Sequence, residues 1–270
     1  MTFARRPHPG HVRNQLQPDG VVRMMKSLAL PVLIAGALLS STCHAAHDDV
    51  DAVGQWLSNR AMQSALQDRG PASRRSESEG MYRVISLSEL DAPEEVKRHF
   101  RAEMARSRAG VKRVSAGEIP SQAEMLSSLP KTVRSNAELR GRLPSPPTNL
   151  RGTLLGAAEL IGMEPSGALN GLKSTGLTRF FRLDGVGIVE FNEENFRAPG
   201  STIEVIAELQ NTKVNQEPAQ LDRVSDDQGR SRASLIWAGE SKLYTLIATG
   251  EGDVQRKVDV LQQIAAAVRD

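Results

Sequence analysis

The sequence predicts an α+β protein, with an antiparallel sheet of about six strands covered by a C-terminal amphipathic helix and preceded by a mainly helical region. Three observations lead to this prediction. The second half of the chain contains short segments rich in β-branched and aromatic residues, separated by turn signals. The last segment, 253–270, has apolar residues at helical spacing. The region before residue 109 has two stretches with helical periodicity.

The C-terminal helix is the clearest of these elements. Asp253 is a suitable N-cap, because its carboxylate can accept a hydrogen bond from the first free backbone N–H groups. The apolar stripe consists of Val254, Val258, Leu261, Ala265 and Val268. Steps of four and three residues place these side chains on one helix face, so we expect that face to lie on the sheet.

Six segments are predicted as strands. They are 177–183, 186–191, 202–209, 218–224, 233–238 and 242–248. Asp184-Gly185 is a strong hairpin signal, and we expect positive φ at both turn positions. The apolar, glycine-containing run 152–163 is predicted as a helix that packs closely in the core.

Two helices are predicted in the first part of the chain, over 48–68 and from Asp91 to about residue 106. Between them, 81–87 has the composition of a strand. The second helix has Val96, Phe100 and Met104 on one face. Its other face carries Lys97, Arg98, Arg101 and Arg106, which indicates a solvated basic surface or, as the alternative, a docking surface for an acidic partner.

Four segments follow from this organisation. Residues 1–46 form a leader, 47–108 a mainly helical region, 109–149 a connector, and 150–270 an α+β domain. The connector contains the proline-rich run 143–148, which is typical of a stiff spacer.

The leader has the features of a secretory signal peptide. Arg23 and Lys26 precede an apolar run over 28–39, and Ala45 and Ala46 are small residues suited to cleavage. The run is shorter than the roughly 20 residues that span a bilayer, so we expect no permanent transmembrane anchor. The polar stretch before it indicates that translation starts at Met24 or Met25.

Export to the periplasm is therefore the predicted localisation. Secretion is one alternative, and lipid anchoring through Cys43 is another. The residues before Cys43 are Ser40, Ser41 and Thr42, which fit a lipoprotein cleavage site poorly. Cleavage after Ala45 or Ala46 is the favoured interpretation.

Loss of the leader changes the chemistry available to the protein. The remaining chain keeps 29 of the 34 basic and 31 of the 32 acidic residues, a formal charge of −2. Net charge then gives no support for nucleic-acid binding. Cys43, the only cysteine, is removed, and His47 and His99 are the only histidines left. We expect no disulfide, no cofactor and no metal site, and we assign no catalytic residue.

Four residues are candidates for ligand binding. Glu190 and Glu194 belong to the densest polar cluster of the chain and have the alternation that would place two carboxylates on one strand face. A solvated strand end is the alternative interpretation of this cluster. Trp237 and Tyr244 are predicted to face each other across the last hairpin, where they would pack in the core or, if exposed, mark a ligand-binding face.

The segment 214–268 also resembles a known group of modules. It contains Pro218-Ala219, a polar turn with Gly229, a Trp237 strand, a Tyr244 strand and a final helix with Leu261. This order resembles small extracytoplasmic modules of unknown function attached to bacterial anti-sigma factors and lipoprotein-carrier-like proteins. The resemblance implies a binding or sensing module rather than an enzyme.

The sequence thus favours a non-enzymatic exported protein that binds an envelope protein or a cell-wall component. One alternative is an envelope hydrolase that uses carboxylates near Glu190 and Glu194. The other is an accessory subunit that folds fully only within an envelope complex. Convergence of both glutamates in a deep pocket would favour the hydrolase, whereas an open sheet face would favour binding.

Overall fold

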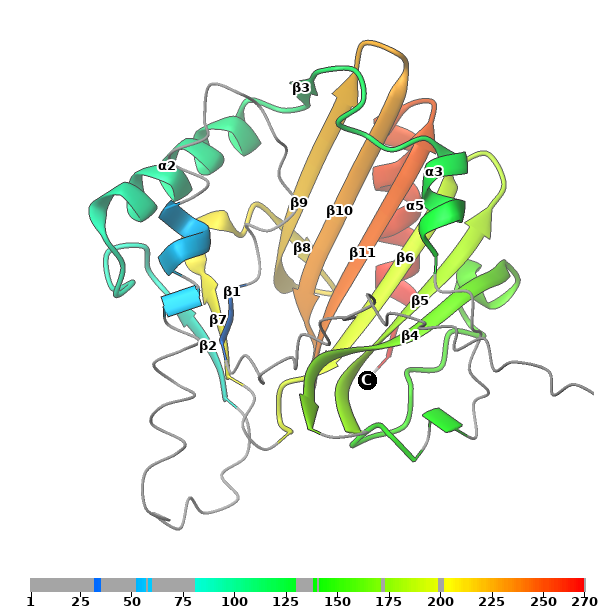
Figure 1. The fold of residues 1–270 in the computed structure, drawn as a ribbon, viewed down its shortest axis with the longest axis horizontal. Coiled ribbons are helices and arrows are strands. Elements are labelled where there is room, and N and C mark those ends of the chain that lie inside the picture. Colours follow the sequence, from blue (N-terminus) through cyan, green and yellow to red (C-terminus); the bar gives the residue numbers. More distant parts are fainter. Residues whose placement is uncertain are drawn as a thin grey trace, which may run out of the picture.

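The chain folds as an α+β protein around one large mixed sheet (Figure 1). The computed structural model describes residues 32–34, 52–56, 58–59, 81–129, 138–139, 141–170, 173–198 and 202–269. In Figure 1 the C-terminal helix α5 lies behind the sheet, and the short helix α3 lies in front of it.

Eight strands form the large sheet. They are β3 (Lys112–Val114), β4 (Glu159–Asn170), β5 (Lys173–Leu183), β6 (Gly187–Asn195), β8 (Thr212–Val214), β9 (Glu217–Asp226), β10 (Arg230–Ala238) and β11 (Lys242–Glu251). Their order is β3-β9-β10-β11-β6-β5-β4, and β8 pairs with the opposite end of β9 from β3.

The prediction of an antiparallel sheet with six strands is wrong in strand number and in strand direction. β3 runs parallel to β9, with Lys112 opposite Val224, which makes the sheet mixed. β3 and β8 contain three residues each, too few for an alternating pattern to be recognised in the sequence.

One of the predicted strands belongs to a different sheet. β7 (Thr202–Ile206) lies between β1 (Val32–Ile34) and β2 (Met81–Ile85) in a parallel three-stranded sheet. Residues Ala207–Leu209, predicted as the end of that strand, form the 3-10 helix η2. A strand's own residues do not specify its partner, because pairing is decided by segments distant in sequence.

The run 152–163 is not a helix. Only Leu154–Gly156 form a turn of 3-10 helix, η1, and β4 begins at Glu159. β4 pairs along its length with β5, with irregularities after Leu160 and Ser166. Short apolar runs without a clear period fit a buried strand as well as a helix, and here the neighbouring strand β5 decides the outcome.

The predicted hairpin over Asp184-Gly185 is present between β5 and β6. Leu183 pairs with Gly187, so the loop has three residues rather than two. Gly185 has φ +71°, whereas Asp184 keeps a negative φ, and the expectation of positive φ at both positions is wrong. A three-residue loop needs the left-handed conformation at one position, which glycine adopts without steric cost.

α5 (Val254–Ala267) forms where it was predicted. The Asp253 carboxylate caps it by accepting a hydrogen bond from the Gln255 backbone N–H at 3.1 Å. Val258, Leu261 and Ala265 are buried against the sheet. The sequence did not indicate that Lys257 would also be buried on this face, where its Nζ donates to Ser231 Oγ and to the Glu251 carbonyl oxygen.

A second apolar cluster lies around α2 (Glu94–Arg108). Val96 and Phe100 are buried and Met104 is partly buried, as the helical spacing predicted. They pack with residues of the small sheet and with Val53 and Trp56 of the helical residues 52–56. On the outer face of α2, Arg101 forms an exposed ion pair with Glu94.

The segment 109–149 takes part in the fold of the large sheet. It supplies β3 and the helix α3 (Gln122–Ser128), which contacts β6 and β11. Ser121 and Glu124 form a capping box at the start of α3. Leu139, in the same segment, is fully buried with Met163 and Leu177.

Candidate functional site

The two aromatic candidates lie in the core. Trp237 and Tyr244 are directly opposite each other on β10 and β11, with ring centroids 5.0 Å apart and nearly parallel planes. Their exposed fractions are 5% and 1%. Both rings point toward the sheet face that α5 covers, which we call the helix face. They therefore stabilise the core and cannot form a ligand-binding surface.

Glu190 and Glu194 lie on the other side of the sheet. Both belong to β6, where Phe191 and Val189 point to the helix face, so the even-numbered side chains point away from α5. We call this side the opposite face. The two glutamates are four residues apart on one strand, which separates their Cα atoms by about 13 Å.

A third glutamate lies near this pair. Glu164 of β4 shares the opposite face, because it pairs with Thr178 of β5, which in turn pairs with Asn192 of β6. We call Glu164, Glu190 and Glu194 the acidic cluster. Asn192 lies between the two glutamates of β6, and its Nδ2 donates to Ser166 Oγ and to Thr178 Oγ1, both at 2.8 Å.

The environment disfavours the charged form of both β6 carboxylates. Burial raises the pKa of Glu190 above its ordinary value, and the nearby charge of Glu164 raises it further. Burial also raises the pKa of Glu194, although a weak hydrogen bond from the Thr175 hydroxyl acts in the opposite direction. Within the described residues, no lysine or arginine forms an ion pair with either carboxylate.

The sequence analysis missed a buried charged network on the helix face. Glu193, between the two predicted glutamates in sequence, is 3% exposed. Its Oε1 accepts from Arg179 Nη2 at 2.7 Å and its Oε2 accepts from Lys242 Nζ at 2.8 Å. The Arg179 guanidinium also lies over the Phe191 ring, 5.0 Å from its centroid. Strand alternation predicts that the Glu193 side chain points to the face opposite to that of Glu190 and Glu194. The sequence alone does not indicate that this face is covered, so the network could not be predicted.

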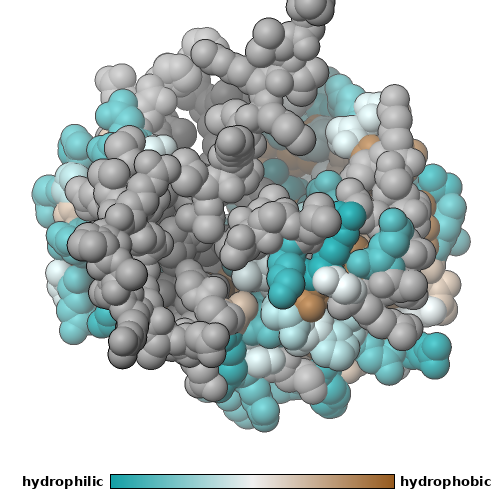
Figure 2. Space-filling view, turned by 60° about the horizontal axis from the view of Figure 1, so that its bottom comes forward, coloured by the Kyte–Doolittle hydropathy of each residue, from teal (hydrophilic) through white to brown (hydrophobic). Residues whose placement is uncertain are grey.

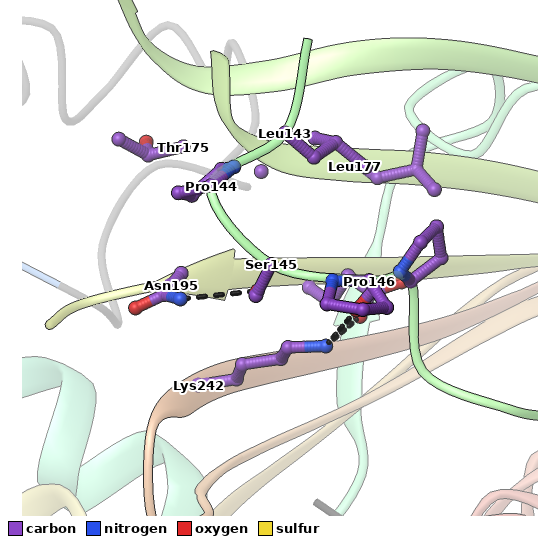
Figure 3. Close-up of a pocket in the computed structure, with 11 residues that line it drawn as sticks. Leu143, Pro144, Ser145, Pro146, Thr175, Leu177, Asn195 and Lys242 are labelled. Atoms are coloured by element: carbon purple, nitrogen blue, oxygen red, sulfur yellow. Dashed lines mark hydrogen bonds and ion pairs between the residues drawn. The ribbon is translucent and has the colours of Figure 1, made fainter. Parts of the chain in front are cut away.

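The network holds the proline-rich run Leu143–Thr148 onto the sheet, and we call this run the strap. The Thr148 backbone N–H donates to Glu193 Oε2 at 2.8 Å, and the Thr148 hydroxyl donates to the same oxygen. Lys242 Nζ donates to the Pro146 carbonyl oxygen at 2.9 Å, and Asn195 Nδ2 donates to Ser145 Oγ at 3.1 Å, as Figure 3 shows. The strap is therefore anchored at Ser145, Pro146 and Thr148.

A hollow of about 190 Å³, solvent at its mouth included, lies beside the strap (Figure 3). Its lining comes from the strap and from the ends of β5, β6 and β11, including Thr175, Glu193, Asn195 and Lys242. The charged groups at its wall are already hydrogen-bonded to one another, so none of them is available as a general acid or base.

One serine–lysine pair also lies in the core of the large sheet. Ser231 and Lys257 have the composition of a serine–lysine pair, with Oγ and Nζ 2.8 Å apart. Each is 1% exposed, and the Ser231 hydroxyl donates to the Gly252 carbonyl oxygen. A substrate has no access to this serine, and the pair instead fixes the start of α5 against β10 and β11.

Several remaining candidates can be placed. His99 is buried on α2 beside Phe100. Cys43, His47, Ala45 and Ala46 lie outside the described residues, as does the leader apart from β1. No three His, Cys, Asp or Glu side chains gather into a possible metal site within the described ranges.

The surface offers few large apolar areas. In the view of Figure 2 the coloured surface is mostly hydrophilic, with small hydrophobic areas scattered over it. Among the described residues, Val84, Val111 and Leu160 are the large apolar side chains that are exposed. None of the helices in the described part of the chain has the length and apolar character required to cross a membrane.

Comparison with known proteins gives no family for this chain. No protein-family model, no curated protein and no solved structure matches it.

Proposed function

We propose that this protein is an exported, non-enzymatic binding module of the cell envelope, and that its acidic cluster binds a cationic segment of an envelope partner. The observation that carries the proposal is the pair Glu190 and Glu194, two largely buried carboxylates on one sheet face that have no basic partner among the described residues. A buried carboxylate without a counter-charge lowers stability, and a bound cation would remove that penalty.

The spacing suggests the form of the ligand. Glu190 and Glu194 are four residues apart on a strand, about 13 Å along the sheet. An extended peptide has the same rise per residue, so basic side chains at positions i and i+4 match both carboxylates. We therefore expect an extended peptide segment with two lysine or arginine residues at this spacing.

The hydrolase alternative receives less support. Carboxyl groups in glycoside hydrolases lie roughly 5 to 9.5 Å apart across the scissile bond. The Cα atoms of Glu190 and Glu194 are about 13 Å apart along one strand, with no histidine or metal site beside them among the described residues. Glu193, the buried carboxylate between them in sequence, is bound by Arg179 and Lys242 on the other face of the sheet. The geometry therefore favours binding over carboxylate-based hydrolysis.

Isothermal titration calorimetry tests the proposal. The probe is a pentapeptide with lysine at its first and last positions and serine between them, titrated into the purified chain at pH 7.5. We expect measurable binding to the wild type and at least a tenfold loss of affinity for the Glu190→Gln/Glu194→Gln variant. Binding should also weaken as the pH falls, because protonation of carboxylates with a raised pKa removes the attraction.

The matched control is Asp259→Asn, which removes an exposed carboxylate from α5 on the far side of the sheet. This variant should bind the pentapeptide like the wild type. Equal affinity for all three proteins, or no heat of binding to the wild type, would disprove a specific role for the acidic cluster.

A further inference from the structure

The strap is bound to the sheet through side chains of the strands. Within the described part of the structure, no main-chain hydrogen bond joins the strap itself to a strand, whereas directly before it the Arg142 carbonyl oxygen accepts from the Ser174 N–H of β5 at 2.9 Å. The strap is therefore not part of the ladder of the sheet. It is held by side chains of β5, β6 and β11, and none of the strand pairings in the described part of the chain includes it.

Most of these side chains contact main-chain atoms of the strap. Lys242 Nζ donates to the Pro146 carbonyl oxygen, and Arg179 Nη1 donates to the Thr148 carbonyl oxygen at 3.1 Å. Glu193 Oε2 accepts from the Thr148 N–H. Any extended peptide offers such carbonyl and N–H groups, so this part of the recognition depends on chain conformation more than on side chains.

Recognition of specific side chains is concentrated at Thr148. Its hydroxyl donates to Glu193, accepts from Lys242 Nζ at 2.9 Å, and lies 3.2 Å from the Tyr244 hydroxyl. Thr148 is 6% exposed. A residue without a hydroxyl at this position would leave buried polar groups unpaired, which is how binding sites reject an incorrect ligand.

The prolines suit the strap to such a site. Pro144, Pro146 and Pro147 fix φ and have no backbone N–H, so they leave no donor unsatisfied and lose little conformational freedom on binding. We call the part of the sheet surface that contacts the strap, at Arg179, Glu193, Asn195 and Lys242, the groove. The small hollow is lined by the groove and the strap together.

We propose that this groove is a binding site for extended, proline-containing peptide segments with a threonine or serine, and that the strap is its intramolecular occupant. A partner segment of the same chemistry binds when the strap is displaced. This site uses other charged residues than the acidic cluster, Arg179, Glu193 and Lys242 on the helix face, so one proposal can fail without the other.

The test weakens the binding of the strap and then measures whether the groove binds an added peptide. Pro146→Gly, Pro147→Gly and Thr148→Ala, combined in the full chain, weaken the strap without touching the groove. The probe is a fluorescent peptide with the sequence of residues 142–149, and the measurement is fluorescence anisotropy. We expect the triple variant to bind the peptide at least tenfold more tightly than the wild type, whose tethered strap competes at a high effective concentration.

Two controls address specificity. A peptide with valine in place of the threonine should bind the triple variant at least tenfold more weakly. Addition of Lys242→Met to the triple variant should weaken binding of the original peptide to a similar extent. Addition of Glu190→Gln and Glu194→Gln instead should leave it unchanged.

Near-ultraviolet circular dichroism, which reports on the packed Trp237 and Tyr244 rings, monitors folding of the triple variant. A folded triple variant that does not bind the peptide would overturn the proposal. An unfolded triple variant would overturn it as well, because the strap would then be an essential part of the fold rather than a replaceable occupant.

Discussion

Three glutamates of β6, Glu190, Glu193 and Glu194, have different environments because strand alternation points their side chains to different faces of the sheet. Glu193 is bound by two cations and by Thr148 on the helix face. Glu190 and Glu194 point to the opposite face, where burial raises the pKa of both carboxyls. The same residue type thus anchors the strap at one position and lacks a basic partner among the described residues at the next.

At the residue scale, Glu194→Gln should stabilise the protein at neutral pH. The pKa of Glu194 is raised in the folded state, so the unfolded chain releases this proton first as the pH rises above about 4.5. The contribution of Glu194 to the free energy of unfolding therefore falls as the pH rises from about 4.5 to the raised pKa of this carboxyl. We expect the variant to be about 1 kcal/mol more stable at pH 7.5 and to match the wild type near pH 4.

Urea unfolding of both proteins between pH 4 and pH 7.5 measures this difference. Glu240→Gln is the control, because Glu240 is exposed in the loop before β11 and its carboxylate is not buried like that of Glu194. A stability difference for Glu194→Gln that stays constant over this range would contradict the assigned burial effect.

At the element scale, local signals were reliable where one segment contains all the necessary information. The Asp253 cap and the apolar stripe of α5 are both present in the structure. The hairpin between β5 and β6 is present as well. The run 152–163 was assigned wrongly, because its residues suit a helix and a buried strand equally well until β5 provides hydrogen-bond partners.

The turn between β8 and β9 gives a prediction at this scale. Val214 pairs with Glu217, so Asn215 and Gln216 form a two-residue loop, with φ +49° and +75°. Glycine is favoured at the second position of such a turn, and a glutamine there is strained. Gln216→Gly should raise the free energy of unfolding by about 1 kcal/mol.

Thermal and urea unfolding check this expectation. Gln228→Gly is the matched control, since Gln228 is also an exposed turn glutamine but has an ordinary negative φ. Glycine there adds freedom to the unfolded chain without relieving strain, so the control should not gain stability. A similar gain in both variants would rule out strain at Gln216 as the cause.

At the scale of the whole molecule, the two faces of the large sheet have different roles. The helix face is covered by α5 and the strap and contains the main apolar core together with the Glu193 network. The opposite face carries the acidic cluster and packs in part against α3 and the small sheet. The two proposed binding sites thus lie on different faces of one sheet, the groove under the strap on the helix face and the acidic cluster on the opposite face.

Export is the prediction that belongs to this scale. Expressed with its leader, the protein should appear in the envelope fraction with an N-terminus at Ala46 or His47, as determined by mass spectrometry of the intact protein. Cys43→Ser should leave its fractionation unchanged, whereas lipid anchoring would require Cys43. A full-length chain that stays in the cytosol would refute the assignment of the leader.

The sequence by itself determined the α+β class, the C-terminal helix and its buried stripe, the hairpin, and the position of polar residues along β6. These features depend on periodicity, capping and turn chemistry within short segments. Only the tertiary structure decided that β7 joins a separate sheet, that β3 makes the large sheet mixed, and that the proline-rich run is a strap pinned by Glu193, Arg179 and Lys242. The reason is physical: strand partners and buried ion pairs come from segments far apart in sequence, and their energy appears only when the folded chain brings them together.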